Sequence, residues 1–162
     1  TSVYFANTHR GKKSLALNLK DPDGVEILMR LAEKSDVLIE AFRPGVAERL
    51  GIGYEQVARR APKIVYASIA AFGQSGPYRD IAAHDLATEA MTGVLSLNRG
   101  GDGKPAIPAL ANADMLASMM TLSGVLMALY RRKETGKGDY LDMAMADCLL
   151  ACLPNSSWQW RW

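Results

Sequence analysis

Short runs of strand length alternate along this chain with longer segments of helical periodicity, and this alternation constrains the fold most strongly. Residues 14–19 alternate between apolar and polar side chains, which predicts a half-buried strand. Residues 36–40, 63–69 and 139–144 are also predicted to be strands, because they are short, rich in apolar side chains and bounded by turn residues. Strands that alternate with helices favour an α/β architecture with a mainly parallel sheet.

The predicted helices lie between these strands. Asp21 is a predicted N-cap and Pro22 the first residue of a helix that continues to Ser35. Periodicity, glycine stops and prolines predict further helices at residues 46–50, 54–60, 84–97, 112–132 and 147–153. The glycine-rich segments at residues 98–108 and 133–138 are predicted connections.

Composition narrows the class of protein. With 49% hydrophobic and 22% charged residues, the 162-residue chain is expected to be soluble and to bury a core, which excludes disordered and collagen-like structure. The formal net charge of +2 disfavours a nucleic-acid partner. Polar residues interrupt the nearly apolar stretch at 115–130, so we interpret it as a core helix and expect no membrane partner. Residues 1–10 show no secretory signal, and we expect a cytoplasmic protein.

Two cysteines, Cys148 and Cys152, lie four residues apart in an apolar segment. They are too few for a disulfide framework and have no neighbouring residues at metal-ligand spacing, so we interpret them as buried free thiols and expect no metal site.

A ligand site is expected in the loop at residues 72–78. This glycine-rich loop follows the predicted strand at 63–69, and open α/β sheets bind ligands at the carboxyl ends of their strands.

His84 and Asp114 are the candidate catalytic pair. Each has an ordinary explanation by itself, because both lie near predicted helix starts, where caps and first-turn charges are common. Together, an imidazole that faces a carboxylate in apolar surroundings forms an acid/base or nucleophile arrangement.

Two basic loops, residues 9–14 and 42–45, with Arg49 shortly after the second, combine cationic side chains with glycines. Phosphate is their natural ligand, although lysines at a strand start also serve simply as solvated charges. The chain lacks the glycine motifs of dinucleotide-binding and P-loop proteins, so neither a nicotinamide cofactor nor a P-loop nucleotide is supported.

The runs at residues 7–20, 35–46, 64–77 and 135–138 resemble the family III CoA-transferases and their relatives, the α-methylacyl-CoA racemases. The resemblance implies a Rossmann-like large domain, with residues 1–153 forming part of this CoA-binding domain. Residues 154–162 would begin a linker towards a small domain, and the chain would be a fragment that lacks segments at both ends. An interlocked homodimer is also implied.

The resemblance assigns roles to the candidate residues. Asp114 matches the essential carboxylate, and His84 matches the histidine of the racemases. The residues expected around the nucleotide of coenzyme A, bound as an acyl-CoA substrate, are Arg10, Phe42, Arg43, Val46 and Arg49.

Three functions remain open. In a CoA-transferase, which acts on an acyl-CoA and a carboxylic acid, Asp114 would attack the thioester. In a racemase, His84 and Asp114 would exchange the α-proton without a covalent intermediate. Ala83 replaces a glycine typical of racemases, and residues 115–119 lack their glycine-rich stretch, so we favour transfer narrowly. The third function is a non-catalytic fragment that binds CoA or packs against a partner.

Overall fold

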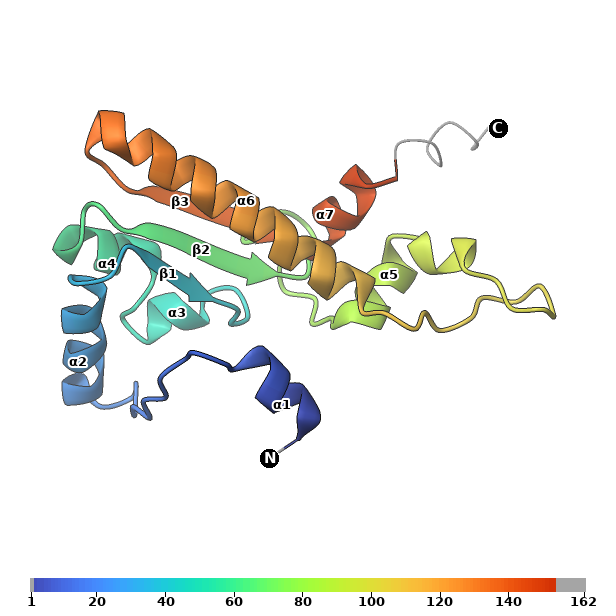
Figure 1. Ribbon diagram of the computed structural model, residues 1–162, viewed down its shortest axis with the longest axis horizontal. Coiled ribbons are helices and arrows are strands. Elements are labelled where there is room, and N and C mark those ends of the chain that lie inside the picture. Colours follow the sequence, from blue (N-terminus) through green and yellow to red (C-terminus); the bar gives the residue numbers. More distant parts are fainter. Residues whose placement is uncertain (1, 154–162) are drawn as a thin grey trace.

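The structure, a computed structural model, describes residues 2–153, and its helices and strands alternate along the chain (Figure 1). The strands are β1 (Val37–Glu40), β2 (Val65–Ala70) and β3 (Asp139–Ala144). The helices are α1 (Val3–Thr8), α2 (Pro22–Ala32), α3 (Val46–Arg49), α4 (Tyr54–Arg60), α5 (Asp85–Met91), the 3-10 helix η1 (Val94–Leu97), α6 (Asn112–Thr135) and α7 (Met145–Ala151).

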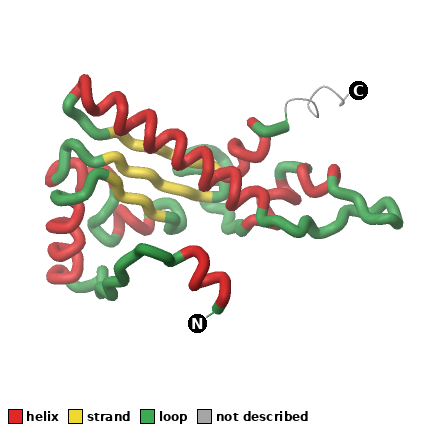
Figure 2. Tube along the Cα trace, viewed as in Figure 1, coloured by secondary structure: helices red, strands yellow, loops and turns green. Residues whose placement is uncertain are grey.

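The three strands form one parallel sheet in the order β1-β2-β3, drawn in yellow in Figure 2. Val65 pairs with Val37 on one side and with Asp139 on the other, so β2 is the central strand. The predicted α/β class with a parallel sheet is confirmed.

Helices cover both faces of β2, which explains why its sequence is apolar without alternation. Val65 and Ala67 point to one face, where α6 crosses the sheet and contributes Val125 and Ala128 (Figure 1). Tyr66 points to the opposite face, into a core formed with α2, α3 and α4, and its hydroxyl donates a hydrogen bond to the carbonyl of Ile52 at 2.9 Å.

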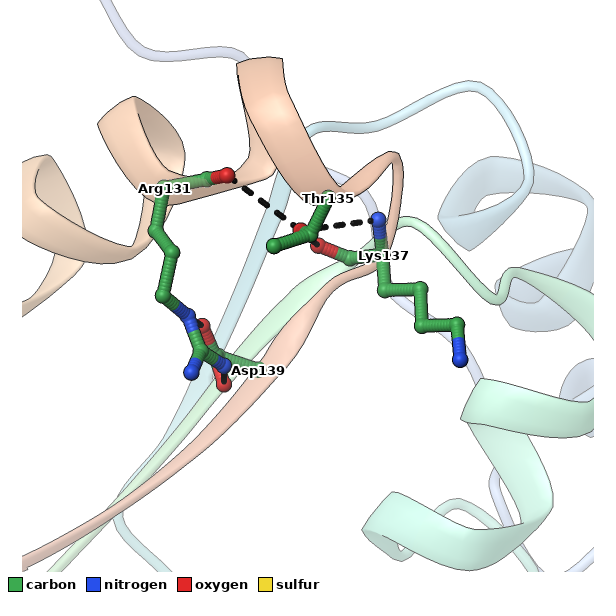
Figure 3. A network of polar contacts seen from close by, with 4 residues as sticks. All are labelled: Arg131, Thr135, Lys137 and Asp139. Atoms are coloured by element: carbon green, nitrogen blue, oxygen red, sulfur yellow. Dashed lines mark hydrogen bonds and ion pairs between the residues drawn. The ribbon is translucent and has the colours of Figure 1, made fainter.

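Polar contacts hold the turn between α6 and β3 (Figure 3). Arg131 on α6 forms an ion pair with Asp139 at the start of β3, and the Thr135 hydroxyl contacts both the Arg131 carbonyl and the Lys137 amide. Gly136 ends the helix in a left-handed conformation with φ +68°.

Arg132 links the carboxyl end of α6 to the residues that precede β1 and β2, at the end of the sheet where the strands begin. Its guanidinium pairs with the Asp36 carboxylate at 2.7 Å and donates to the Lys63 carbonyl at 2.8 Å. One side chain therefore joins three elements.

The predicted strand at residues 14–19 is wrong, because this segment is coil. The alternation of apolar and polar residues concerns the side chains alone, and no strand within residues 2–153 pairs with this segment. The Asn18 carbonyl accepts a local hydrogen bond from the Asp21 amide at 3.0 Å. Leu15 is exposed, whereas Leu19 packs at the margin of the core beside α2.

The other differences concern one cysteine and the helix bounds. Cys148 is a buried free thiol as predicted, whereas Cys152 is exposed. The helix predicted at 84–97 divides at Gly93, whose φ of +80° ends the first part and leaves α5 followed by η1. Helix α6 extends to Thr135, α7 begins directly after β3 at Met145, and α1 was not predicted from the sequence. The predicted linker at 154–162 lies outside the described residues.

By length and composition alone, α6 could cross a membrane. One side of α6 packs against the sheet and α7, and the other side is exposed. Small buried residues form the covered side of the helix: Ala113 and Ala117 pack against α7, and Ala128 packs against β2. Thr121 is buried as well.

Candidate active site

The chain segments that follow the three strands meet at one edge of the sheet, because parallel strands have their carboxyl ends on the same side. After β1 the chain continues as residues 41–44, after β2 as the loop at 71–83, and after β3 directly into α7. The amino-terminal end of α6 lies at the same edge, packed against α7.

A cavity of about 350 Å³ opens between these segments. Its wall includes Phe42 and Arg43 after β1, Ile69 at the end of β2 and Met145 after β3. A cavity therefore lies at the carboxyl edge, where open α/β sheets bind ligands. The loop at residues 72–78, in which the sequence predicts a ligand site, does not line it. A separate cavity of about 480 Å³ is lined, from that loop, by Phe72, Ser75, Pro77 and Tyr78.

His84 and Asp114 both line this cavity, although thirty residues of chain separate them. His84 is the residue before α5 and its side chain forms no capping hydrogen bond. Asp114 lies in the first turn of α6, and its carboxylate has no hydrogen-bond partner within residues 2–153. Neither side chain is therefore used as a cap.

Asp85, which follows His84, performs the capping role instead. Its carboxylate accepts a hydrogen bond from the backbone N–H of Asp114 at 3.1 Å. The residue at the N-cap position of α6 is Ala111, which has no side-chain acceptor. The start of α5 thus supplies the cap of α6, and one contact fixes the relative position of His84 and Asp114.

Burial against the cavity wall raises the pKa of the Asp114 carboxyl above its ordinary value, and repulsion by Asp85 raises it further. Attraction to His84 lowers this pKa and opposes both effects. A carboxylate with a raised pKa is more basic than an ordinary aspartate, as a general base or nucleophile requires.

A second cavity of about 150 Å³ adjoins the first and shares Arg43, Pro44 and Arg79 with it. Val46 and Arg49 line it as well, so four of the five residues expected around CoA lie in these two cavities. Arg10 is the fifth, and it lies in the exposed turn after α1, outside the lining of both. Its assignment remains a prediction.

The loop after β2 is fastened to β3 by Asp142, whose two carboxylate oxygens accept the backbone N–H of Gln74, each at 3.0 Å. The carbonyl of Gln74 in turn accepts a hydrogen bond from Nε of Arg79 at 2.8 Å. The loop and its arginine are thereby positioned from the neighbouring strand.

Sequence reasoning missed Asp85 and Arg79 as site residues. For Asp85 the signal was its position beside His84 at a predicted helix start. For Arg79 the signal was its place in the loop that follows β2, where a cation faces the same edge as Arg43. The described residues contain no group of three histidine, cysteine or acidic side chains suited to hold a metal ion.

The profile of the CoA-transferase family III matches residues 1–162. The chain belongs to this family. Among its family III relatives, the acetyl-CoA:oxalate CoA-transferase of Acetobacter aceti is 39% identical over 98% of this chain. Human alpha-methylacyl-CoA racemase is 44% identical over 85% of the chain.

A solved CAIB/BAIF family protein from Brucella suis superposes on 93% of the chain with a TM-score of 0.88 and 33% identity. The chain spans only 41%, 36% and 40% of the lengths of these three proteins.

Proposed function

We propose that the protein transfers CoA between an acyl-CoA thioester and a carboxylic acid, with Asp114 as the nucleophile. One observation carries this proposal: the raised-pKa carboxyl of Asp114 lines a cavity that continues into a second cavity rich in arginine. Such a pair of cavities suits a long ligand with an anionic end and a reactive end, which is the form of acyl-CoA.

In the proposed reaction an oxygen of the Asp114 carboxylate attacks the thioester carbonyl. The carbon–sulfur bond breaks, CoA leaves as the thiolate, and an acyl-aspartyl anhydride remains. The thiolate then attacks the aspartyl carbonyl, which releases the first acid as its carboxylate and forms an aspartyl-CoA thioester.

The incoming carboxylate attacks that thioester and expels CoA, which leaves a new anhydride. Attack by the thiolate on its acyl carbon yields the new acyl-CoA and restores the Asp114 carboxylate. Protons need not be exchanged overall, and His84 serves as a hydrogen-bonding group beside the substrate.

Racemisation is the second candidate, favoured by the histidine at position 84 in the same cavity as Asp114. One of the two groups would remove the proton α to the thioester carbonyl and the other would return one to the opposite face. The relatives that match the chain include both a CoA-transferase and a racemase, consistent with either activity on this scaffold.

The two activities and a non-catalytic protein are separated by one set of assays. The protein is incubated with a chiral 2-methylacyl-CoA in deuterated water and, separately, with succinyl-CoA and a panel of carboxylic acids. A new acyl-CoA supports transfer, deuterium at the α-carbon supports racemisation, and neither product leaves CoA binding or partner packing as the function.

Asp114→Ala is expected to abolish whichever activity is found, because both mechanisms need its carboxylate. His84→Ala is expected to abolish racemisation but only to weaken transfer, where the histidine carries no obligatory proton. Turnover that survives Asp114→Ala unchanged would overturn the mechanism.

A further inference from the structure

Two guanidinium groups converge above Gly45, at the second cavity. A β-carbon at this glycine would lie 3.3 Å from Nη2 of Arg79 and 3.4 Å from Nη1 of Arg49. Gly45 has φ +81°, a conformation that a side chain disfavours, so the chain both turns and leaves space here. The two arginines come from elements far apart in the sequence, α3 and the loop after β2.

The N–H groups that face this point have no protein acceptor. Nε and Nη1 of Arg79 are occupied by the Gln74 carbonyl and by Asp80, whereas Nη2 forms no hydrogen bond within the described residues. The Arg49 guanidinium has neither a hydrogen bond nor an ion pair within residues 2–153. Two cations so placed repel each other, and a bound anion would relieve the repulsion.

Two residues that do not line the second cavity, Gln74 and Asp142, orient the Arg79 side chain. Asp142 on β3 holds the N–H of Gln74, and the carbonyl of the same residue holds Nε of Arg79. A guanidinium with Nε restrained presents Nη2 in a defined direction, which a lysine in its place would not reproduce.

We propose that Arg79 contacts the pyrophosphate of CoA together with Arg49, and that Asp142 is a positioning residue that acts through Gln74 and Arg79. The identity of the anion rests on the proposed function. The second cavity is lined by neither His84 nor Asp114, so an anion bound there belongs to the part of the ligand away from the reacting thioester. Guanidinium pairs bind phosphate oxygens with charge-assisted, bidentate hydrogen bonds.

The test is calorimetric binding of CoA and of inorganic pyrophosphate to the wild-type protein and its variants. Arg79→Gln is expected to weaken the binding of both ligands by about 10-fold to 100-fold, as the loss of a charged hydrogen-bond donor implies. Arg79→Lys should recover only part of this loss. Arg30→Gln, which removes the same charge from the exposed end of α2, is the matched control and should leave both affinities within about twofold of wild type.

A double-mutant cycle tests the positioning role. Asp142→Asn should weaken pyrophosphate binding less than Arg79→Gln does, and it should have no further effect once Arg79 is glutamine. An equal loss in both backgrounds would show that Asp142 acts only on general stability and would overturn this role. Far-UV circular dichroism and thermal unfolding identify any variant that fails to fold. If Arg79→Gln is such a variant, the affinity of Arg79→Lys for pyrophosphate tests the Arg79 contact in its place.

The binding data separate a failure of the Arg79 assignment from a failure of the proposed function. If wild-type protein binds CoA and Arg79→Gln binds it equally well, the assignment of Arg79 is wrong and the proposed function stands. If wild-type protein binds neither CoA nor pyrophosphate, the proposed function fails and the assignment fails with it.

Discussion

Asp85 carries two effects on Asp114 that differ in kind. Its carboxylate accepts the backbone N–H of Asp114 and so stabilises the start of α6, while its negative charge raises the pKa of the Asp114 side chain. The first effect depends on an acceptor oxygen and the second on a charge, so substitutions separate them.

We predict that Asp85→Ala lowers the free energy of unfolding by about 1 kcal/mol, because α6 loses its cap. Asp85→Asn keeps an acceptor oxygen and should cost less. Urea denaturation of both variants measures the difference. An alanine variant as stable as the asparagine variant would contradict the capping role.

The same asparagine variant should change the pH dependence of turnover. Removal of the Asp85 charge lowers the pKa of Asp114, so the acidic limb of the rate profile is expected to move to lower pH. Rates measured across the acidic range test this shift. An unmoved limb would show that Asp85 has no electrostatic effect on the reacting group.

Asp114 is also expected to reduce stability at neutral pH. Its pKa is higher in the folded protein than its ordinary value of 3.8, so the folded state binds the proton more tightly. The free energy of unfolding therefore falls as pH rises from about 3.8 through the folded-state pKa, and it stays reduced above that range.

Asp114→Asn, which cannot ionise, should be more stable than wild type at neutral pH and should lose this advantage in acid. Thermal midpoints measured from about pH 3 to about pH 8 test the prediction. Asp102→Asn, at an exposed carboxylate away from the cavity, controls for the loss of one negative charge. A stability difference that does not change with pH would contradict the predicted burial cost.

At the scale of elements, two adjacent arginines at the end of α6 differ in importance. Arg132 is 21% exposed and joins α6 to the starts of β1 and β2, whereas Arg131 is 61% exposed and pairs with Asp139 at the surface. We predict that Arg132→Gln lowers the free energy of unfolding by about 1 to 2 kcal/mol. Arg131→Gln, the matched control, should cost less than about 1 kcal/mol. Chemical denaturation of the two variants decides between this order and its reverse.

Elements with sequence-local causes were predictable. The start of α2 follows from Asp21 and Pro22, whose capping geometry the structure confirms, and β2 follows from an apolar run of strand length. The conformation of residues 14–19 was not predictable, because strand formation depends on a backbone partner that side-chain alternation does not reveal.

The candidate site was predictable only where a local sequence signal exists. The sequence pointed to His84, Asp114 and the edge after β2, and the structure brings these together. The roles of Asp85 and Arg79 depend on contacts between segments distant in sequence, one to the start of α6 and one to the surroundings of Gly45. Such contacts follow from the packed arrangement of the sheet, loops and helices and have no local pattern.

At the scale of the molecule, one face of α6 is apolar and exposed. Its residues follow one another three or four positions apart, and they are Met115, Met119, Leu122, Leu126 and Tyr130. An apolar surface of this kind promotes association, and the homodimer implied by the family resemblance remains a prediction.

We predict that the chain self-associates through this face. The double substitution Met119→Lys with Leu126→Lys should lower the mass measured by size-exclusion chromatography with light scattering, without loss of helical content. Ser35→Lys with Gly101→Lys adds the same charge at exposed positions elsewhere. If the control pair lowers the mass equally, net charge rather than the α6 face is responsible.

The pairing of Val65 with Asp139 has a consequence during protein synthesis. The central strand β2 leaves the ribosome long before its neighbour β3. It also leaves before α6, the helix that covers one face of β2. Until Ala144 has emerged, the nascent chain exposes an unpaired strand edge beside Val65 and Ala67, a segment prone to pair with other chains. Slow translation between residues 71 and 138 should therefore reduce the yield of folded protein more than slow translation after Ala144.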